Sequence, residues 1–243
     1  MKPFAALAVT TVPDVETARR LYGLGDLDEA SVVKVLHHQN KQPGAAGTGL
    51  RPHEQRVAAV SVAALSGGEL RLWTRTTVEV AEAAVLRKLF RAAGDLEALV
   101  TWRGRSGELA ALRLRAMAHD LGARALFRLT DGDARHLALA DRLDPAATGV
   151  TLDGAALALG LPGLLGSLDR DPWEAVRAGD AQALRERGEL VALNLCLIAL
   201  RHWRVSGAWS HKRAREAWQL VRRALARAEP PHLRRFLAAW PAD

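Results

Sequence analysis

The pattern of apolar and polar residues predicts a strand at the start of the chain. Residues Phe4–Asp14, FAALAVTTVPD, form an almost unbroken apolar run that stops at Pro13, which cannot donate a ladder hydrogen bond. Such a run is typical of a central strand that is covered on both faces. Helical spacing follows over Val15–Tyr22, with Asp14 as the expected N-cap and Gly23 as the expected stop.

The next part of the chain predicts a β-hairpin and a helix. Arg56–Leu65 is a second apolar run, and Glu69–Arg75 alternates apolar residues with charge, as a half-exposed strand does. Because only Ser66-Gly67-Gly68 separates the two runs, they are expected to pair as an antiparallel hairpin. Thr77 is then expected to cap a helix that extends to about Ala93.

The remaining residues alternate strand and helix before the pattern becomes purely helical. A strand, a helix, a short strand and a short helix are predicted at Ala98–Trp102, Glu108–His119, His136–Leu143 and Leu152–Leu159. Three helices are expected in the last quarter, over Asp180–Val205, Ser210–Arg227 and Pro231–Trp240. Leu24–Leu36 is amphipathic and in part helical, whereas the stretches predicted to be loops are His37–Pro52 and Leu164–Pro172. The pattern alone therefore predicts an α/β fold.

The positive charge of the chain indicates which class of partner it would bind. Its 243 residues suit one domain with a helical extension. Lys plus Arg number 34 against 27 for Asp plus Glu, and 29 of the 34 are arginine. Guanidinium groups bind phosphate in bidentate geometry, so this balance favours a phosphate-bearing partner. A codon bias that enriches Arg, Ala, Gly and Leu together would give the same composition, and both interpretations stay open.

Composition also bears on compartment and metal chemistry. The single cysteine, Cys196, lies in an apolar run and is expected to be buried and inert. No stretch reads as a signal peptide or a membrane span, so a soluble cytoplasmic protein without membrane association is expected. His37 and His38 are adjacent, but no acidic or thiol side chain stands at ligand spacing beside them. They are predicted to be exposed loop residues.

Three stretches of the sequence carry a family resemblance. Leu99–Ala116, LVTWRGRSGELAALRLRA, resembles the second motif of the predicted 3′–5′ exonucleases related to the proofreading domain of B-family DNA polymerases. Phe4–Asp14 is similar to the first motif of that family, and Arg187–Leu195, RGELVALNL, to the third. The resemblance implies a ribonuclease H-like fold, a mixed β-sheet flanked by helices. It also implies an exonuclease-like domain at 1–207 and a helical extension at 208–243 packed on it.

The resemblance also indicates where catalytic metal ions would bind. In that family four acidic positions hold the ions, and this chain carries at them Ala8, Thr10, Glu108 and Val191. Two dications a few ångström apart repel one another and need a clamp of carboxylates, which one glutamate cannot supply. The expected protein is therefore a catalytically inactive relative with no metal and no cofactor.

The former metal site is expected to hold phosphate instead of cutting it. Arg103 replaces an asparagine of the family motif, and a fixed guanidinium repels a dication but attracts a phosphate. The candidate contacts to single-stranded DNA or RNA are Trp102, Arg103, Arg105 and Arg115. The alternatives are structural ion pairs for Arg105 and Arg115, and a place in the core for Trp102.

Two other functions stay open at this point. An active exonuclease that depends on Mg or Mn would need relocated ligands, drawn from Asp14, Glu16, Glu108, Asp141 and Glu189. A protein-interaction scaffold or regulatory subunit would use the C-terminal helices, whose aromatic residues are Trp203, Trp209, Trp218 and Trp240. The alternative for these aromatics is an amphipathic helical pair that closes the domain's own core.

Overall fold

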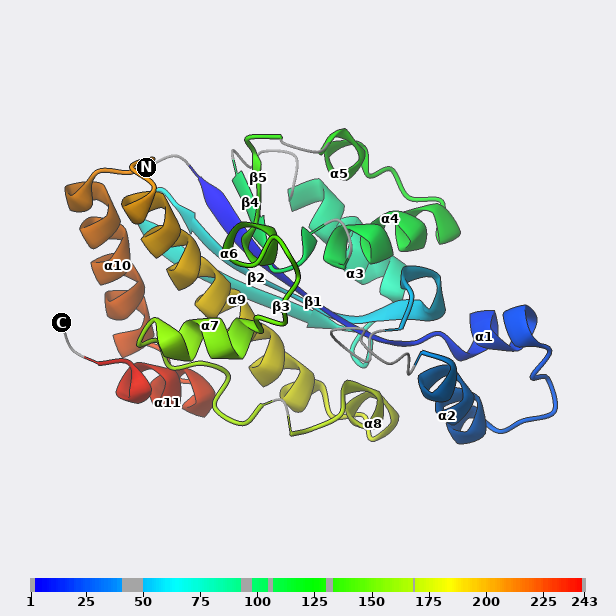
Figure 1. Cartoon of the computed structure of the whole chain (residues 1–243). Coiled ribbons are helices and arrows are strands. Elements are labelled where there is room, and N and C mark those ends of the chain that lie inside the picture. Colours follow the sequence, from blue (N-terminus) through cyan, green and yellow to red (C-terminus); the bar gives the residue numbers. More distant parts are fainter. Residues whose placement is uncertain are drawn as a thin grey trace.

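A five-stranded mixed β-sheet forms the centre of the computed structural model, which describes residues 3–40, 50–92, 98–104, 107–129, 133–167 and 169–241 (Figure 1). The strand order is β3-β2-β1-β4-β5. The strands are β1 (Phe4–Pro13), β2 (Gln55–Ser66), β3 (Glu69–Thr76), β4 (Ala98–Thr101) and β5 (His136–Ala138). The predicted α/β class is confirmed, and β1 is the central strand that its apolar run predicted.

Strand direction follows from the connections between the strands. β1 and β2 are antiparallel, and β2 and β3 form the predicted hairpin. Its turn is made by Gly67 and Gly68, whose φ angles of 58° and 80° lie in the left-handed region that glycine adopts without strain. β4 then pairs in parallel with β1, and β5 in parallel with β4, because helices intervene before both strands.

Helices cover both faces of the sheet. They are α1 (Val15–Tyr22), α2 (Glu29–Gln39), α3 (Glu82–Ala92), α4 (Glu108–Ala118), α5 (Arg124–Arg128), α6 (Leu139–Leu143), α7 (Leu152–Ala158), α8 (Pro172–Arg177), α9 (Ala181–Val205), α10 (His211–Ala226) and α11 (Pro231–Ala239), with a 3₁₀ turn at Pro52–Glu54. The small residues Ala6 and Ala8 of β1 face the long helix α9 in one apolar cluster. Leu7, on the alternate side of the strand, packs with residues of α3 and α4.

Several boundaries differ from the sequence predictions. Helix α3 begins at Glu82, because the backbone N–H of Thr77 donates to the carbonyl of Ala58 instead of starting a helix. Helix α2 extends through His37 and His38, so these residues are helical and the predicted loop at His37–Pro52 is wrong at its start. Residues 41–49 of that stretch lie outside the described part of the chain. The short helices α5 and α8 were not predicted, and the strand expected at His136–Leu143 ends at Ala138.

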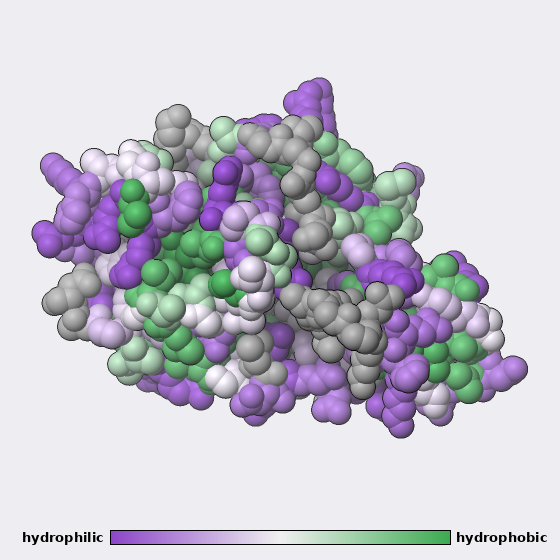
Figure 2. Space-filling view, in the orientation of Figure 1, coloured by the Kyte–Doolittle hydropathy of each residue, from purple (hydrophilic) through white to green (hydrophobic). Residues whose placement is uncertain are grey.

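The C-terminal helices complete the core on the α9 side. Buried residues of α10 and α11, among them Val221 and Phe236, belong to the same apolar cluster as β1 and α9. Phe4 lies edge-on to Trp203 at 4.8 Å and to Trp209 at 5.9 Å between ring centroids. In Figure 2, hydrophobic residues gather over α7 and α9, and hydrophilic residues cover α10. Within the described ranges, no helix has the length and apolar character needed to cross a bilayer.

Candidate functional site

Two of the four motif positions lie in one apolar cluster, and a third is buried on β1. Ala8 is 3% exposed and sits in the cluster under α9, against which Val191 also packs. Thr10 is 8% exposed and lies at an irregularity where the pairing of β1 with β2 shifts by one residue. The structure therefore brings Ala8 and Val191 into one cluster, and neither residue offers a ligand to a cation.

The fourth position, Glu108, is the first residue of α4 and binds the backbone at the end of β4. Its two carboxylate oxygens each accept a hydrogen bond at 3.1 Å, one from the backbone N–H of Trp102 and one from that of Arg103. Burial raises the pKa of Glu108, and the backbone donors oppose that rise. The carboxylate thus holds the chain where it turns from β4 into α4.

A cavity of about 170 Å³ opens beside Glu108. It is lined by Val9, Thr11, Gln55, Arg103, Gly107 and Glu108. The side chain of Arg103 is exposed at its rim, so a cationic group and a carboxylate that is bound to backbone amides face the same space. Across the described ranges, no group of three or more His, Cys, Asp or Glu side chains is arranged to hold a metal ion.

Arg115 is held in an ion-pair network. It contacts Glu82 through two nitrogens, at 2.9 and 2.6 Å, and Asp14 at 2.7 Å, and its side chain is only 15% exposed. Hydrogen bonds and charge from Glu82 and Asp14 raise the pKa of Arg115 despite its burial, which acts in the other direction. A phosphate that bound Arg115 would have to compete with these carboxylates, so the geometry gives no support to a phosphate contact there. The ion-pair alternative is what the geometry shows.

The other three predicted contacts, Trp102, Arg103 and Arg105, differ in where they lie. Trp102 is 9% exposed and packs in the core cluster, so its ring does not present a face for base stacking. This burial agrees with the core alternative for Trp102, and the geometry gives no support to the stacking role. Arg105 lies outside the described residues. Of the predicted nucleic-acid contacts, Arg103 is the one that the structure places on the surface beside the former metal site.

The carboxylates proposed as relocated ligands are dispersed. Glu189 is buried, accepts from Thr74 at 3.0 Å, and lies 2.7 Å from the imidazole of His232. Glu16 pairs with Arg19 on the surface of α1, and Asp141 is exposed in α6. Asp14 caps α1 through the N–H of Thr17 besides binding Arg115. Asp14, Glu16 and Glu189 have separate structural partners, and within the described ranges these carboxylates do not form a common cation site.

Sequence reasoning missed Glu82 as a member of the network. This residue lies at the start of α3, and besides Arg115 it accepts from the backbone N–H of Val57 at 2.7 Å. Its partners are 25 and 33 positions away in the chain, so no local spacing signals the contact. Of the carboxylates that bind Arg115, the sequence pattern identified Asp14, as an N-cap, and did not identify Glu82.

Comparison with known protein families matches residues 48–240 to the predicted 3′-5′ exonuclease related to the exonuclease domain of PolB. The chain belongs to this exonuclease family. The matched range includes the motifs at Leu99–Ala116 and Arg187–Leu195 and extends over α10 and α11, whereas β1 precedes it. A search of curated proteins found no significant match.

Membership of this family implies divalent cations, and the side chains of this chain do not fit them. At the four ligand positions only Glu108 carries a carboxyl group, and both of its oxygens accept hydrogen bonds from backbone amides. Arg103 stands at the same cavity and would repel a dication. The residues at these positions in this member of the exonuclease family therefore do not suit a pair of divalent cations.

Proposed function

We propose that this member of the exonuclease family is catalytically inactive and binds single-stranded nucleic acid through the basic surface around Arg103. The observation that carries the proposal is the engagement of Glu108 with the N–H groups of Trp102 and Arg103. Phosphodiester hydrolysis in a two-metal site needs several carboxylates to hold both cations. Ala8, Thr10 and Val191 supply none, and moving Glu108 onto a cation would leave two backbone donors without their acceptor.

The charge of the molecule supports binding to a polyanion. The net charge is +7, and Arg103 is exposed beside a cavity at the carboxyl ends of β1 and β4. Sites in open α/β sheets commonly lie at this edge, outside the carboxyl ends of the strands. A guanidinium there attracts the phosphodiester backbone without any need for a metal.

The first test measures cleavage. The full chain is incubated with end-labelled single-stranded DNA and RNA in Mg²⁺, in Mn²⁺ and in a chelator, with Glu108→Ala as the matched variant. The proposal expects no release of nucleotides above the chelator control. Metal-dependent degradation from the 3′ end that Glu108→Ala abolishes would overturn it and establish an active nuclease.

The second test measures binding across a salt series by fluorescence anisotropy. Affinity for an unstructured oligonucleotide should fall steeply as salt rises from about 50 to 200 mM, because cations leave the phosphates on binding. Arg103→Gln should weaken binding and reduce the slope of log affinity against log salt by about one. The control is Arg234→Gln, which removes the same charge from the surface of α11. Equal affinities of the two variants would contradict a contact at Arg103.

The structure gives no specific support to a scaffold that docks partners through its C-terminal aromatics. Trp240 is 3% exposed, and Trp203 stacks on Trp209 at 4.9 Å within the molecule. Trp218 lies 5.0 Å from Trp240. These rings are used in packing α9, α10 and α11 together, which is the alternative that the sequence left open.

A further inference from the structure

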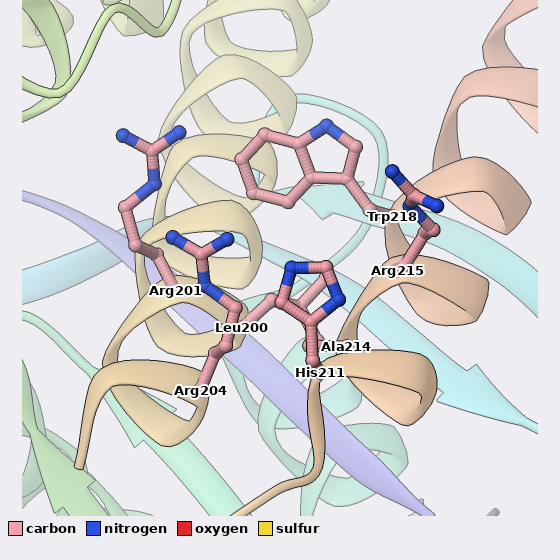
Figure 3. Close-up of a pocket in the computed structure, with 7 residues that line it drawn as sticks. All are labelled: Leu200, Arg201, Arg204, His211, Ala214, Arg215 and Trp218. Carbon is pink, nitrogen blue, oxygen red and sulfur yellow. The ribbon is translucent and has the colours of Figure 1, made fainter. Parts of the chain in front are cut away.

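A second basic cavity lies between the end of α9 and the start of α10. It has a volume of about 170 Å³ and is lined by Leu200, Arg201, Arg204, His211, Ala214, Arg215 and Trp218. Figure 3 shows Arg201 and Arg204 extending from α9, and His211, Arg215 and Trp218 coming from α10 opposite them. Every ionisable side chain in the lining is a base, and no acidic residue contributes to it.

The arginines of this cavity are anchored to different degrees. Arg201 donates to the carbonyl of Leu159 at 2.7 Å, and its guanidinium lies 5.3 Å from the centre of the Trp218 ring. These contacts fix Arg201 against the wall formed by Trp218. Arg204, His211 and Arg215 are exposed, and among the described residues none of them has an ion pair or hydrogen bond from its side chain. Three donors therefore face the cavity with their hydrogen-bonding capacity unused.

The local charges favour an anion at this cavity. The amino end of a helix carries a partial positive charge, and acidic residues normally offset it. The first turn of α10 contains no acidic residue and instead has His211, Lys212 and Arg213 after the N-cap Ser210. Arg201 and Arg204 approach this end from α9. Like charges gathered in this way repel one another, and a bound anion would remove the repulsion.

We propose that this cavity binds a phosphate group. Guanidinium groups form charge-assisted, bidentate hydrogen bonds with phosphate oxygens. Arginines from two helices, α9 and α10, line this cavity. A cavity of about 170 Å³ accommodates one phosphate group.

The site is independent of the function proposed above. Phe4, the first residue of β1, contacts Trp203 and Trp209, which stand beside Arg204 and Ser210 in the chain. The cavity therefore adjoins the amino end of β1, whereas Arg103 lies at the carboxyl end of β4. Variants at the two ends separate the two proposals.

The test titrates inorganic phosphate into the full chain by isothermal titration calorimetry, with Arg204→Gln/Arg215→Gln as the test variant and Arg234→Gln as the charge control. Both replaced side chains are exposed, so the fold should be retained, and circular dichroism checks it. Wild type and control should bind with saturation, and the double variant should bind about a hundredfold more weakly, since each charged hydrogen bond contributes about tenfold or more. No saturable binding by the wild type, or equal affinity of the double variant, would overturn the proposal.

Further titrations identify the source of the phosphate group. A nucleoside 5′-monophosphate and an oligonucleotide with and without a terminal phosphate are compared in the same three proteins. Tighter binding of the free nucleotide that the double variant loses assigns the site to a small phosphate ester. A terminal phosphate that improves oligonucleotide binding in the wild type but not in the double variant assigns it to a strand end. Arg103→Gln should leave phosphate affinity unchanged in every case, even if the nucleic-acid proposal fails.

Discussion

At the scale of single residues, the partners of a side chain determine its role more than its chemical type does. Glu108 retains a carboxylate at a position where the exonuclease family binds metal, yet its oxygens accept from the N–H groups of Trp102 and Arg103. Cys196 shows the same dependence, since burial raises the pKa of its thiol to about 12 and keeps it protonated at neutral pH. Its predicted inertness agrees with this environment.

Replacing Glu108 by alanine should destabilise the fold. The variant leaves two backbone donors at the end of β4 without acceptors, and the free energy of unfolding should fall by about 1–3 kcal/mol in urea denaturation. Glu229→Ala, at an exposed position, is the control and should change stability by less than about 0.5 kcal/mol. Equal stabilities of the two variants would mean that the hydrogen bonds from Trp102 and Arg103 to Glu108 do not stabilise the fold.

Gly188 is a residue whose size matters more than its backbone freedom. A Cβ atom there would overlap the Oγ of Ser61, which is 1% exposed and lies 2.9 Å from the hydroxyl of Thr74. The absence of a side chain thus lets α9 lie close against β2.

Gly188→Ala should lower the free energy of unfolding by about 1–3 kcal/mol through overpacking. Ser61→Ala in the same chain removes the overlapping oxygen and should recover part of this loss in thermal or urea unfolding. Gly25→Ala, where a Cβ meets no atom within 4 Å, is the matched control. A Gly188→Ala protein as stable as this control would show that α9 is not packed as tightly as described.

At the scale of elements, buried ion pairs join segments that are distant in the chain. Arg115 of α4 binds Glu82 of α3 and Asp14 at the start of α1, which ties two helices to the end of β1. Burial alone would raise the pKa of Glu82, but hydrogen bonds from Arg115 and His119 outweigh it and lower this pKa below its usual value of 4.5. The charged form of Glu82 is therefore favoured in the folded state.

This network predicts how stability depends on pH. Because the pKa of Glu82 is lower in the folded state, its contribution is present above pH 4.5 and is lost as pH falls below that value. Glu82→Gln should reduce the free energy of unfolding at neutral pH by about 1.5–3 kcal/mol and flatten its decline in acid. Urea unfolding between about pH 7 and pH 3 measures both effects. A variant with an unchanged pH profile would contradict the network.

At the scale of the whole molecule, the C-terminal helices share the core of the sheet domain. Val221 and Phe236 belong to the cluster that contains Phe4 and Ala8, and His232 of α11 contacts Glu189 of α9. The boundary predicted between 207 and 208 stays a prediction. The family match extends across it to residue 240.

Truncation tests this continuity. A chain that ends at residue 207 would expose the α9 surface that α10 and α11 cover. It would also leave Glu189 without its contact to His232. We expect it to aggregate or to lose its cooperative thermal transition, because a buried apolar surface of this kind is the main source of stability. A soluble 1–207 chain with the full-length unfolding midpoint would show that the two helices are separable.

Elements with strong local signals were predicted correctly from the sequence. The helix α1 has the predicted bounds, since Asp14 caps it and Gly23 ends it with φ 65°. The long helix α9 likewise begins after its cap Asp180. Weak or short elements were missed, such as α5 and α8, because few residues give too little periodicity. The predicted start of α3 at Thr77 was wrong because the backbone N–H of Thr77 donates to the distant carbonyl of Ala58.

The sequence by itself determined which strongly patterned segments form strands and helices and, through the family resemblance, that Ala8, Thr10 and Val191 carry no carboxylate, since residue type and local spacing need no fold to be read. Only the tertiary structure decided that Arg115 forms ion pairs with Glu82 and Asp14 and that Arg204 and Arg215 line one cavity. The physical reason is that hydrogen bonds and charges act over a few ångström in space. Residues 33 and 101 positions apart, as in the Arg115 pairs, come within that range only when the sheet and its helices have packed.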